Sequence, residues 1–455
     1  MSDIDQLRNK MDEITLEMIK SLKNRMDVAK QIGSIKTEKG LSVTDETRES
    51  SLRTKVLSLC KDIGIDESTG ARFLNFLLNE SVKIQSTNKP THLSVFLKAK
   101  SLEEEGKKII HMEIGEPNFL PPKIVKKSLE EVYDKGFVKY GHAKGMTQLR
   151  NALSEKINKK FAINSKQENI LVSPGARFGV YLAITTLLEP GDEIIIFEPA
   201  WPAYRDCAIN SGIKVRAIKT QLENKWEPSI QKIEDTINSN TKMIVLNYPN
   251  NPTGKILPEN IQDQIVNLAM KKNLYVLSDE IYSDYSYRQW KSVLSYNYEK
   301  SIITQSFSKS HAMTGFRIGY AVAHKDIIDK MAKLQAICLT NVPEPIQYVA
   351  LKALDADISS NSINIKSNLD VLIEKAKEMN LDFVVPDGAM YLFAKVRKND
   401  FDGTEFSKNL LNYGLAVAPG EGFGDYRNFL RISACQDKKE LIEGMKILDK
   451  VLGEK

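Results

Sequence analysis

The sequence is poor in the residues that cross-link small proteins or bind metal ions. Its 455 residues include four cysteines and five histidines, and neither type recurs at the spacing of a disulfide framework or a metal site. The scattered cysteines predict reduced thiols. An apolar signal segment at the N-terminus and any run of about 18 apolar residues are also missing. We therefore expect a soluble, cytoplasmic protein without a bound metal.

Excess charge of one sign is scarce as well. Lys and Arg number 64 against 59 for Asp and Glu, a net charge of +5, and no compact basic run occurs. The composition thus gives no reason to expect nucleic acid or a membrane as a partner. A hydrophobic share of 42% and a charged share of 27% are ordinary for globular proteins. The length predicts about three folded units.

Proline is absent before Pro90, and the pattern up to that point is helical. Apolar side chains recur every three or four positions over residues 4–36, which predicts one long amphipathic helix that ends by Gly40. Gly33 interrupts it at a cost of about 1 kcal/mol, which close packing would explain. Two more helices are predicted over residues 44–61 and 67–85, separated at Gly64. Because the apolar stripes are narrow, we expect this all-α unit, residues 1–89, to dimerise.

The cations of the long helix cannot all face one ligand. Arg25 and Lys36 share a helix face roughly 16 Å apart, whereas Arg8 lies roughly 42 Å from Lys36 along a straight helix. One ligand could meet all three only if an antiparallel second chain contributed its own Arg8. On spacing alone, solvated charges on the surface of a bundle are the more common explanation.

Taken together, the polar residues of these helices resemble the active-site set of the all-helical, AroQ-type chorismate mutases. The matching residues, within residues 3–88, are Arg8, Arg25, Lys36, Asp45, Arg48, Glu49, Ser81 and Gln85. Chorismate rearranges to prephenate intramolecularly, so such a site needs neither a covalent catalyst nor a metal.

The resemblance implies an intertwined dimer in which Arg8 reaches the partner's site. It implies that the arginines organise the carboxylates of chorismate, and that Lys36 and Gln85 donate hydrogen bonds to its ether oxygen. Glu49 and the region of Asp45 would take the ring hydroxyl, while Ser81 would complete the pocket wall.

Beyond a polar stretch that predicts a linker over residues 86–92, strand-like and helical segments alternate. Apolar runs predict buried strands over residues 170–172, 193–197, 243–247, 274–278 and 301–305. The alternation predicts an α/β fold around a mostly parallel sheet for residues 90–355. Residues 356–455, with runs at 391–396 and 429–433, predict a smaller α+β lobe, which an arm of about residues 90–120 would join.

One stretch of this second part, residues 306–320, gathers reactive groups. Lys309 follows the hydroxyls of Ser306 and Ser308, and Arg317 stands eight residues further on. A pyridoxal phosphate site requires an amine to form a Schiff base, with hydroxyls and a guanidinium to hold the phosphate. Taken alone, the stretch is equally typical of a solvated surface.

Other polar residues lie where an α/β sheet presents ligands, at the ends of predicted strands. Residues 173–177 follow one strand and open a helix, so their backbone N–H groups could cradle a phosphate. Asp279 ends another strand three residues before Tyr282; it could keep a pyridine nitrogen protonated or simply cap a helix. Arg431 lies in an apolar run, where its charge needs either a bound anion or a salt bridge.

In their order along the chain, these residues resemble the fold-type I, class I/II aminotransferases over about residues 91–453. The pattern comprises Tyr140, Gly175, Trp201, Asn251, Asp279, Tyr282, Ser306, Lys309, Arg317 and Arg431. The resemblance implies pyridoxal 5'-phosphate as the cofactor.

The same resemblance implies a role for each residue. Lys309 would be the Schiff-base lysine and the proton carrier, and Arg431 would clamp the substrate α-carboxylate beneath the backbone near Gly115. The cofactor ring would be held by Asp279, Tyr282, Asn251 and Trp201. The phosphate would be held by Gly175, Ala176, Arg177, Ser306, Ser308, Arg317 and Tyr140 of the partner subunit.

The fusion of the two units suggests one bifunctional enzyme of aromatic amino acid biosynthesis. We expect it to make prephenate from chorismate, and to aminate prephenate or an aromatic 2-oxo acid with Glu or Asp as donor. We expect a homodimer or larger homo-oligomer. An aspartate/2-oxoglutarate aminotransferase with a regulatory N-terminal unit is the alternative. A DNA-binding regulator that senses pyridoxal phosphate is disfavoured, because it would need a short helix-turn-helix and a basic face.

Overall fold

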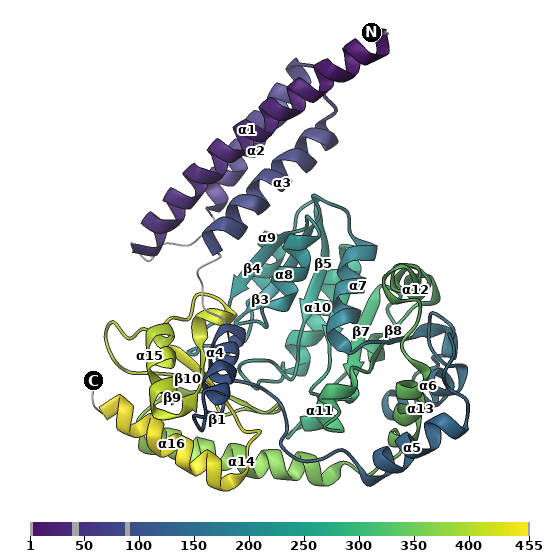
Figure 1. Ribbon diagram of the computed structural model, residues 1–455, viewed down its shortest axis with the longest axis vertical. Helices are drawn as coiled ribbons and strands as arrows, with labels where there is room; N and C mark the ends of the chain where they lie inside the picture. Colours follow the sequence, from purple (N-terminus) through teal and green to yellow (C-terminus); the bar gives the residue numbers. More distant parts are fainter. Residues whose placement is uncertain (1–2, 39–44, 87–91, 454–455) are drawn as a thin grey trace. The chain divides into compact units, whose positions relative to one another are not determined.

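The computed structural model describes residues 3–38, 45–86 and 92–453 (Figure 1). The chain divides into two compact units: Met1–Lys89 with Gly212–Lys214 form the first, and Pro90–Ser211 with Val215–Lys455 form the second. The predicted helix end at Gly40 and the predicted linker, apart from its two ends, lie outside the described residues. None of the helices in the described part of the chain combines the length and apolar character needed to cross a bilayer.

In its described residues the first unit consists of the three predicted helices: α1 (Asp3–Glu38), α2 (Glu46–Asp62) and α3 (Glu67–Ser86). Asp45 caps α2, because its carboxylate accepts a hydrogen bond from the backbone N–H of Arg48 at 3.0 Å. Gly64 follows α2 with a φ of +72°, a left-handed conformation that favours glycine. The predicted break between the second and third helices therefore lies at a turn that glycine stabilises.

Two glycines allow these helices to approach closely. A Cβ on Gly33 of α1 would lie 3.0 Å from the Cγ of Gln85 in α3, so the interruption of the long helix does serve close packing. A Cβ on Gly70 of α3 would lie only 2.2 Å from the Sγ of Cys60 in α2. Both contacts depend on the missing side chain.

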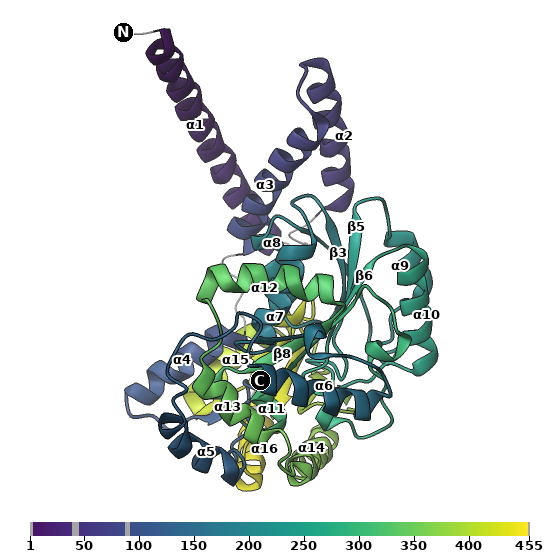
Figure 2. The same ribbon diagram turned by 90° about the vertical axis from the view of Figure 1, so that its right-hand side faces the viewer.

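Away from these contacts, α1 leaves much of its apolar stripe uncovered. Leu7 is 64% exposed, Met11 69% and Met18 52%. Figure 2 shows why, since the N-terminal half of α1 diverges from α2 and α3. Exposed apolar surface on this scale is typical of a helix that lacks its packing partner.

The second unit contains a sheet of seven strands, mostly parallel as predicted. In spatial order they are β2 (Ile170–Ser173), β8 (Gly319–Ala323), β7 (Ser301–Ser306), β6 (Tyr275–Asp279), β5 (Thr241–Leu246), β3 (Glu193–Glu198) and β4 (Lys214–Lys219). Strands β3, β5, β6 and β7 pair in parallel, whereas β8 is antiparallel to both β7 and β2. The sequence did not predict β4 or β8.

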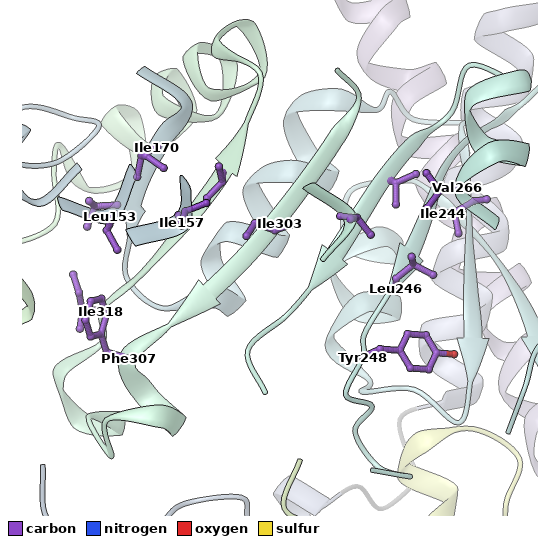
Figure 3. Close-up of a cluster of buried hydrophobic side chains, with 14 of the residues drawn as sticks. Leu153, Ile157, Ile170, Ile244, Leu246, Tyr248, Val266, Ile303, Phe307 and Ile318 are labelled. Carbon is purple, nitrogen blue, oxygen red and sulfur yellow. The ribbon is translucent and has the colours of Figure 1, made fainter. Parts of the chain in front are cut away.

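Helices cover this sheet, so most residues of its inner strands are buried, whereas the edge strand β4 is only half-buried. The covering helices, with those of the loops around them, are α5 (Lys123–Asp134), α6 (Thr147–Phe161), α7 (Ala176–Leu187), α8 (Ala203–Asn210), α9 (Ile230–Thr236), α10 (Glu259–Lys271), α11 (Phe307–Ser310), α12 (Lys325–Leu339) and α13 (Glu344–Ala353). All six residues of β3 and of β7 are buried. Figure 3 shows Leu153, Ile244 and Ile303 in the shared apolar core.

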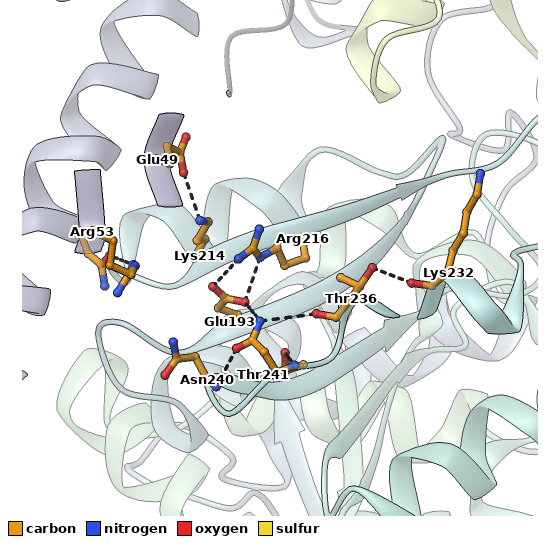
Figure 4. Close-up of polar contacts among 11 residues, drawn as sticks. Glu49, Arg53, Glu193, Lys214, Arg216, Lys232, Thr236, Asn240 and Thr241 are labelled. Carbon is orange, nitrogen blue, oxygen red and sulfur yellow. Dashed lines mark hydrogen bonds and ion pairs between the residues drawn. The ribbon is translucent and has the colours of Figure 1, made fainter. Parts of the chain in front are cut away.

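Hydrogen bonds between charged side chains hold the edge strand β4 against β3. The carboxylate of Glu193, at the start of β3, accepts two hydrogen bonds from Arg216 of β4, at 2.9 and 3.1 Å (Figure 4). The side-chain amide of Asn238 donates a third, at 2.8 Å. Glu193 is 2% exposed, so these bonds compensate a buried charge and fix the edge strand.

A smaller lobe surrounds a second core. Its antiparallel sheet has the order β12 (Ala418–Pro419), β13 (Phe429–Ser433), β10 (Tyr391–Lys395) and β9 (Asp382–Phe383), and β1 (Ile110–His111) pairs separately with β11 (Leu415–Ala416). Helices α14 (Ser359–Glu378), α15 (Gly403–Leu410) and α16 (Lys438–Gly453) belong to this lobe. The N-terminal helix of the unit, α4 (His92–Glu104), packs Val95, Ala99 and Leu102 against Leu411 and Ala416.

Gly70→Ala tests the contact between α2 and α3. We expect the overlap with Cys60 to outweigh the better helix propensity of alanine and to destabilise the helical unit by about 1–3 kcal/mol. Hydrogen exchange on the full chain should then show faster exchange in α2 and α3 and unchanged exchange in the second unit. Adding Cys60→Ala removes the clashing sulfur and should restore the protection; no restoration would refute the contact as the cause.

Candidate active site

A cavity of about 380 Å³ opens in the second unit, where the carboxyl ends of its strands meet residues of the smaller lobe. The residues expected there from the sequence that line it are Gly115, Ala176, Arg177, Trp201, Asn251, Asp279, Tyr282, Ser308, Lys309, Arg317 and Arg431. Those that the sequence did not single out are Phe96, Ile114, Tyr204, Asn247, Ile281, Thr314 and Tyr391. Most of the cofactor and substrate set predicted from the sequence therefore converges on one space.

Lys309 reaches the cavity from α11, the short helix that follows β7. Ser306 caps this helix, because its hydroxyl accepts a hydrogen bond from the backbone N–H of Ser308 at 3.0 Å. The Nζ of Lys309 donates to the carbonyl oxygen of Gly115 at 2.6 Å. Burial lowers the pKa of Lys309, and the nearby guanidiniums of Arg431 and Arg317 lower it further. A lowered pKa favours the neutral amine, which is the nucleophilic form.

Asp279 lies at the end of β6 and is 3% exposed. Its carboxylate accepts hydrogen bonds from the hydroxyl of Tyr204 at 2.8 Å and from that of Thr304 at 3.1 Å. Burial raises the pKa of Asp279 to about 6, against the effect of these bonds. A buried carboxylate of this kind favours a cationic ring nitrogen opposite it, because the cation would stabilise the ionised form.

A compact polar turn lies beside Asp279. Asn247 donates from its side chain to the carbonyl oxygen of Asp279 at 2.8 Å, and its own Oδ1 accepts the backbone N–H of Asn251 at 3.0 Å. The hydroxyl of Tyr282 lies 2.7 Å from that of Tyr391. Asn251 and Tyr282 thus both line the cavity with hydrogen-bonding groups, as a site for a phenolic oxygen requires.

The turn between β2 and α7 forms a cradle for an anion. A Cβ on Gly175 would lie 2.8 Å from the Nη2 of Arg317, and Gly175 has a φ of +89°. Helix α7 begins at Ala176, so its first backbone N–H groups lack partners within the helix. Arg317 donates to two backbone carbonyls, of Thr314 at 2.9 Å and Pro174 at 3.4 Å. A phosphate fits this cradle of N–H groups and guanidinium.

Ser306 stands behind Ser308 in this part of the site. Its hydroxyl donates to the carbonyl oxygen of Ile318 at 2.9 Å and lies 2.8 Å from the hydroxyl of Ser308. Of the two serines, Ser308 lines the cavity. Tyr140 is 88% exposed and does not line the cavity of its own chain. Its contribution to a partner's phosphate site stays a prediction.

Arg431 forms the opposite end of the cavity and is 2% exposed. Its guanidinium donates to the Oδ1 of Asn251 at 3.0 Å and to the carbonyl oxygen of Glu113, and its Nε has no partner in the described part of the chain. The rings of Tyr391 and Phe423 lie 4.4 and 4.9 Å from it. Arg431 forms no salt bridge with a carboxylate among the described residues, and a bound anion as its partner stays a prediction.

The candidate chorismate residues are only partly brought together within one chain. Arg25 of α1 donates to the hydroxyl of Ser81 and to the carbonyl oxygen of Leu77 at 2.6 Å. Burial lowers the pKa of Arg25. The Oε1 of Gln85 is buried without a partner among the described residues. These groups from α1 and α3 face one region between the two helices.

The other candidates lie elsewhere on the first unit. Lys36 lies in the last turn of α1, and Arg48 and Glu49 lie in the first turn of α2, after the capping residue Asp45. Arg8 lies near the start of α1, at the opposite end from Lys36, and contacts Asp5 at 3.7 Å, with 74% of its side chain exposed. A site that includes Arg8 needs a second chain.

Sequence reasoning missed several residues of the cavity. Asn247 carried a usable signal, because it ends the predicted strand over residues 243–247. Asp279 likewise follows directly after a predicted strand, over residues 274–278. Tyr204 had no such signal, since its partner Asp279 is 75 residues away in the sequence. Tyr391 looked like an ordinary apolar strand residue, and Phe96 like one face of a helix.

The sheet, the buried amine, the carboxylate and the anion cradle define a pyridoxal phosphate enzyme of the transferase class. Comparison with known families agrees for both units. The family model "Aminotransferase class I and II" matches residues 107–448, and "Chorismate mutase type II" matches residues 7–86. The chain belongs to the class I and II aminotransferases, with an N-terminal chorismate mutase type II domain, and its cofactor is pyridoxal phosphate.

Individual relatives cover most of the second unit. An aspartate aminotransferase of Thermotoga maritima is 32% identical over 352 residues, which are 76% of this chain and 92% of the relative. The aspartate/prephenate aminotransferase of Thermus thermophilus is 28% identical over 380 residues, 82% of this chain and 98% of the relative. The crystal structure of the Thermotoga enzyme superposes with a TM-score of 0.77 at 31% identity, covering 82% of this chain and 99% of that one.

Lys309→Ala tests the amine of the site. We expect turnover to fall by at least about 100-fold, because a positioned acid–base group contributes on that scale. Cofactor should still bind in part, since the cradle at Gly175 and Arg317 is untouched. The measurements are the rate of amino transfer and the cofactor retained after dialysis. Lys333→Ala, an exposed lysine of α12, is the control; unchanged turnover in Lys309→Ala would refute the assignment.

Proposed function

We propose that this chain is a bifunctional enzyme of aromatic amino acid biosynthesis. It rearranges chorismate to prephenate in the helical unit and transfers an amino group to prephenate or an aromatic 2-oxo acid in the second unit, with Glu or Asp as donor. The observation that carries the proposal is the presence of both domains in one chain, since the product of one reaction is a 2-oxo acid.

The names of relatives support the aromatic acceptor. Besides the aspartate/prephenate enzyme of Thermus, an aromatic-amino-acid aminotransferase of Thermococcus litoralis is 31% identical over 359 residues. Several other relatives are named aspartate aminotransferases. These names favour, as the second candidate, an aspartate/2-oxoglutarate aminotransferase whose helical unit is mainly regulatory.

In the proposed amino transfer, each residue acts through a contact that the cavity already contains. Pyridoxal phosphate, when bound, supplies a ring that withdraws electrons from the substrate Cα. Arg431 binds the α-carboxylate and orients the substrate, while the Nζ of Lys309 takes and returns the proton at Cα. Asp279 keeps the proton on the ring nitrogen, and Arg317 with the turn at Gly175 holds the phosphate.

The cations of the cavity suggest which substrates fit. Lys309, Arg317 and Arg431 have roles in the mechanism above, which leaves Arg177. Its guanidinium lies 4.8 Å from the ring of Trp201. Burial raises the pKa of Asp206, and the charges of Arg205 and Arg177 partly oppose that rise. From the sequence we expect Arg177 to bind the cofactor phosphate as part of the turn over residues 173–177. We propose that its side chain binds a second carboxylate, which Glu, Asp and prephenate all carry and phenylpyruvate does not.

In the proposed mutase reaction, the helical unit works by positioning and by charge. Arg25 organises the substrate carboxylates, and Lys36 and Gln85 donate to the ether oxygen as negative charge develops on it. The unpartnered Oε1 of Gln85 and the contact of Arg25 with Ser81 support a preformed polar pocket. Arg8 completes it from a second chain.

A homodimer follows from both halves of the proposal. Arg8 and Tyr140 each serve a site on the partner subunit, and both are exposed in the single chain. The uncovered apolar stripe of α1 supports pairing of the helical units.

All four cysteines lie within the described residues and are free thiols, which supports the expected cytoplasmic location.

Arg25→Ala separates the two activities. We expect prephenate formation to fall by about 100-fold or more, the loss typical of a preorganised charged donor. Amino transfer should stay within about twofold of the parent, because Arg25 belongs to the helical unit. Chorismate consumption and amino transfer are measured on the same preparation, with Arg72→Ala, an exposed arginine of α3, as control. Loss of both activities would contradict independent sites.

Arg177→Ala tests the substrate assignment. For enzyme already loaded with an amino group from glutamate, we expect kcat/KM for prephenate and oxaloacetate to fall by about 10- to 100-fold, as for loss of a charged hydrogen bond. Phenylpyruvate and 4-hydroxyphenylpyruvate should be almost unaffected. Arg397→Ala, outside the cavity, is the control. In the parent enzyme, preference for oxaloacetate over every aromatic acceptor would instead support the aspartate aminotransferase.

A further inference from the structure

His111, the last residue of β1, lies between two carboxylates. Its Nδ1 is 2.8 Å from the Oε1 of Glu113, and its Nε2 is 3.1 Å from the Oε1 of Glu103 on α4. An ionised carboxylate only accepts hydrogen bonds, so the ring must donate from both nitrogens to satisfy both contacts. The geometry therefore corresponds to the imidazolium form.

The inner carboxylate depends on this histidine. Glu113 is fully buried, and its recorded ion pair within the described residues is the one with His111. Its second oxygen, Oε2, is buried without a partner in the same part of the chain. Glu103, by contrast, is a third exposed and also pairs with Lys100 at 2.7 Å. Losing the proton of His111 would thus leave a buried charge at Glu113 poorly compensated.

The segment that contains Glu113 also contacts residues at the two ends of the active site. The carbonyl oxygen of Glu113 accepts a hydrogen bond from Arg431, and that of Gly115 accepts one from Lys309 at 2.6 Å. On the other side, α4 carries Phe96, which lines the cavity and whose ring centroid is 6.1 Å from that of His111. The imidazole thus links the α4 wall of the cavity to the backbone that orients Arg431.

We propose that His111 is a positioning residue for recognition of the substrate carboxylate. Held as an imidazolium by Glu103 and Glu113, it fixes the peptide that orients Arg431 and the helix that carries Phe96. The inference rests on the proposed role of Arg431 as the carboxylate ligand, and it adds a residue that touches neither substrate nor cofactor.

The positioning depends on pH in a definite direction. The hydrogen bond with Glu113 raises the pKa of His111 above its ordinary value; partial burial opposes this, and the charges of Glu113 and Glu103 add to it. Lys100 faces Glu103 from the same helix, and the neutral side chain of Gln436 donates to the His111 carbonyl oxygen at 2.9 Å. The link is intact below the raised pKa and is lost as pH rises through it, so KM should rise there while kcat changes little.

Glu103→Gln is the decisive variant, because it removes one charge from a partly exposed position. The pH at which KM for the 2-oxo acid rises should move downward. At pH values just above neutral, KM should be about three- to tenfold higher than in the parent, with kcat within about twofold. Glu104→Gln, its exposed neighbour on α4, is the matched control. His111→Gln should give a high KM that no longer varies with pH over this range.

Two readouts do not depend on turnover. Affinity for maleate, an unreactive dicarboxylate, measured by calorimetry on the holoenzyme, should follow the same pH profile. The imidazole of His111, assigned by its disappearance from spectra of the His111→Gln variant, should titrate above about 6.5 in the parent and lower in Glu103→Gln. Titration at or below that value, or an unshifted KM profile in Glu103→Gln, would overturn the inference.

Arg431→Lys separates this inference from the function on which it rests. A higher KM in Arg431→Lys together with an unshifted profile in Glu103→Gln would refute the role of His111 and keep the carboxylate ligand. An unchanged KM in Arg431→Lys would refute the carboxylate ligand itself, and the inference with it.

Discussion

The buried guanidinium of Arg431 is the constraint on which the active site depends. It is a full charge at 2% exposure, held by one amide, one peptide oxygen and the faces of two aromatic rings. Such contacts offset only part of the cost of removing a cation from water. The packed core around β13, whose five residues are all buried, stabilises the lobe against the remaining cost. In the proposed function, a substrate carboxylate would meet a cation that is already desolvated, so binding would gain more than it would in water.

The same charge acts on the other end of the cavity. Arg431 and Arg317 both lower the pKa of Lys309, in addition to the larger effect of burial. The cations that we propose as ligands of the anionic substrate and the phosphate therefore also favour the neutral amine, against the opposing charges of Cys435 and Glu116. Anions bound at both arginines would weaken that effect and make it easier for the lysine to hold a proton. A single electrostatic arrangement thus suits the amine first as a nucleophile and then as a proton carrier.

The sequence predicted the three N-terminal helices and most of the buried strands because their signals are local. The period of apolar residues placed α1, α2 and α3 within two residues of their observed ends, wherever those ends are described. The buried strands β3 and β7 were found from continuous apolar runs. The edge strand β4 is only half-buried, so it has no continuous apolar run. Strand β8 begins with Gly319 and Tyr320, at the end of the stretch over residues 306–320, and shows no such run either.

The active-site residues likewise divide into those with a local sequence signal and those whose contacts form only on folding. Asp279 and Lys309 were predicted because their immediate neighbours form a recognisable pattern. Tyr204 was missed because its function comes from a contact made only after folding. His111 and Glu113 were not singled out from the sequence, because their link to Glu103 on α4 is likewise visible only in three dimensions.

In the helical unit, the same part of α1 matters for stability and for the proposed catalysis. The N-terminal half of α1, where Leu7 and Met11 are exposed, is also the half that carries Arg8. A helix packed on only one part of its length gains little from propensity alone, because tertiary contacts supply most helical stability. Whatever covers Leu7 and Met11 must therefore also lie beside Arg8. In the proposed dimer, the apolar contact that makes the helix stable is also the contact that carries the arginine to the second site.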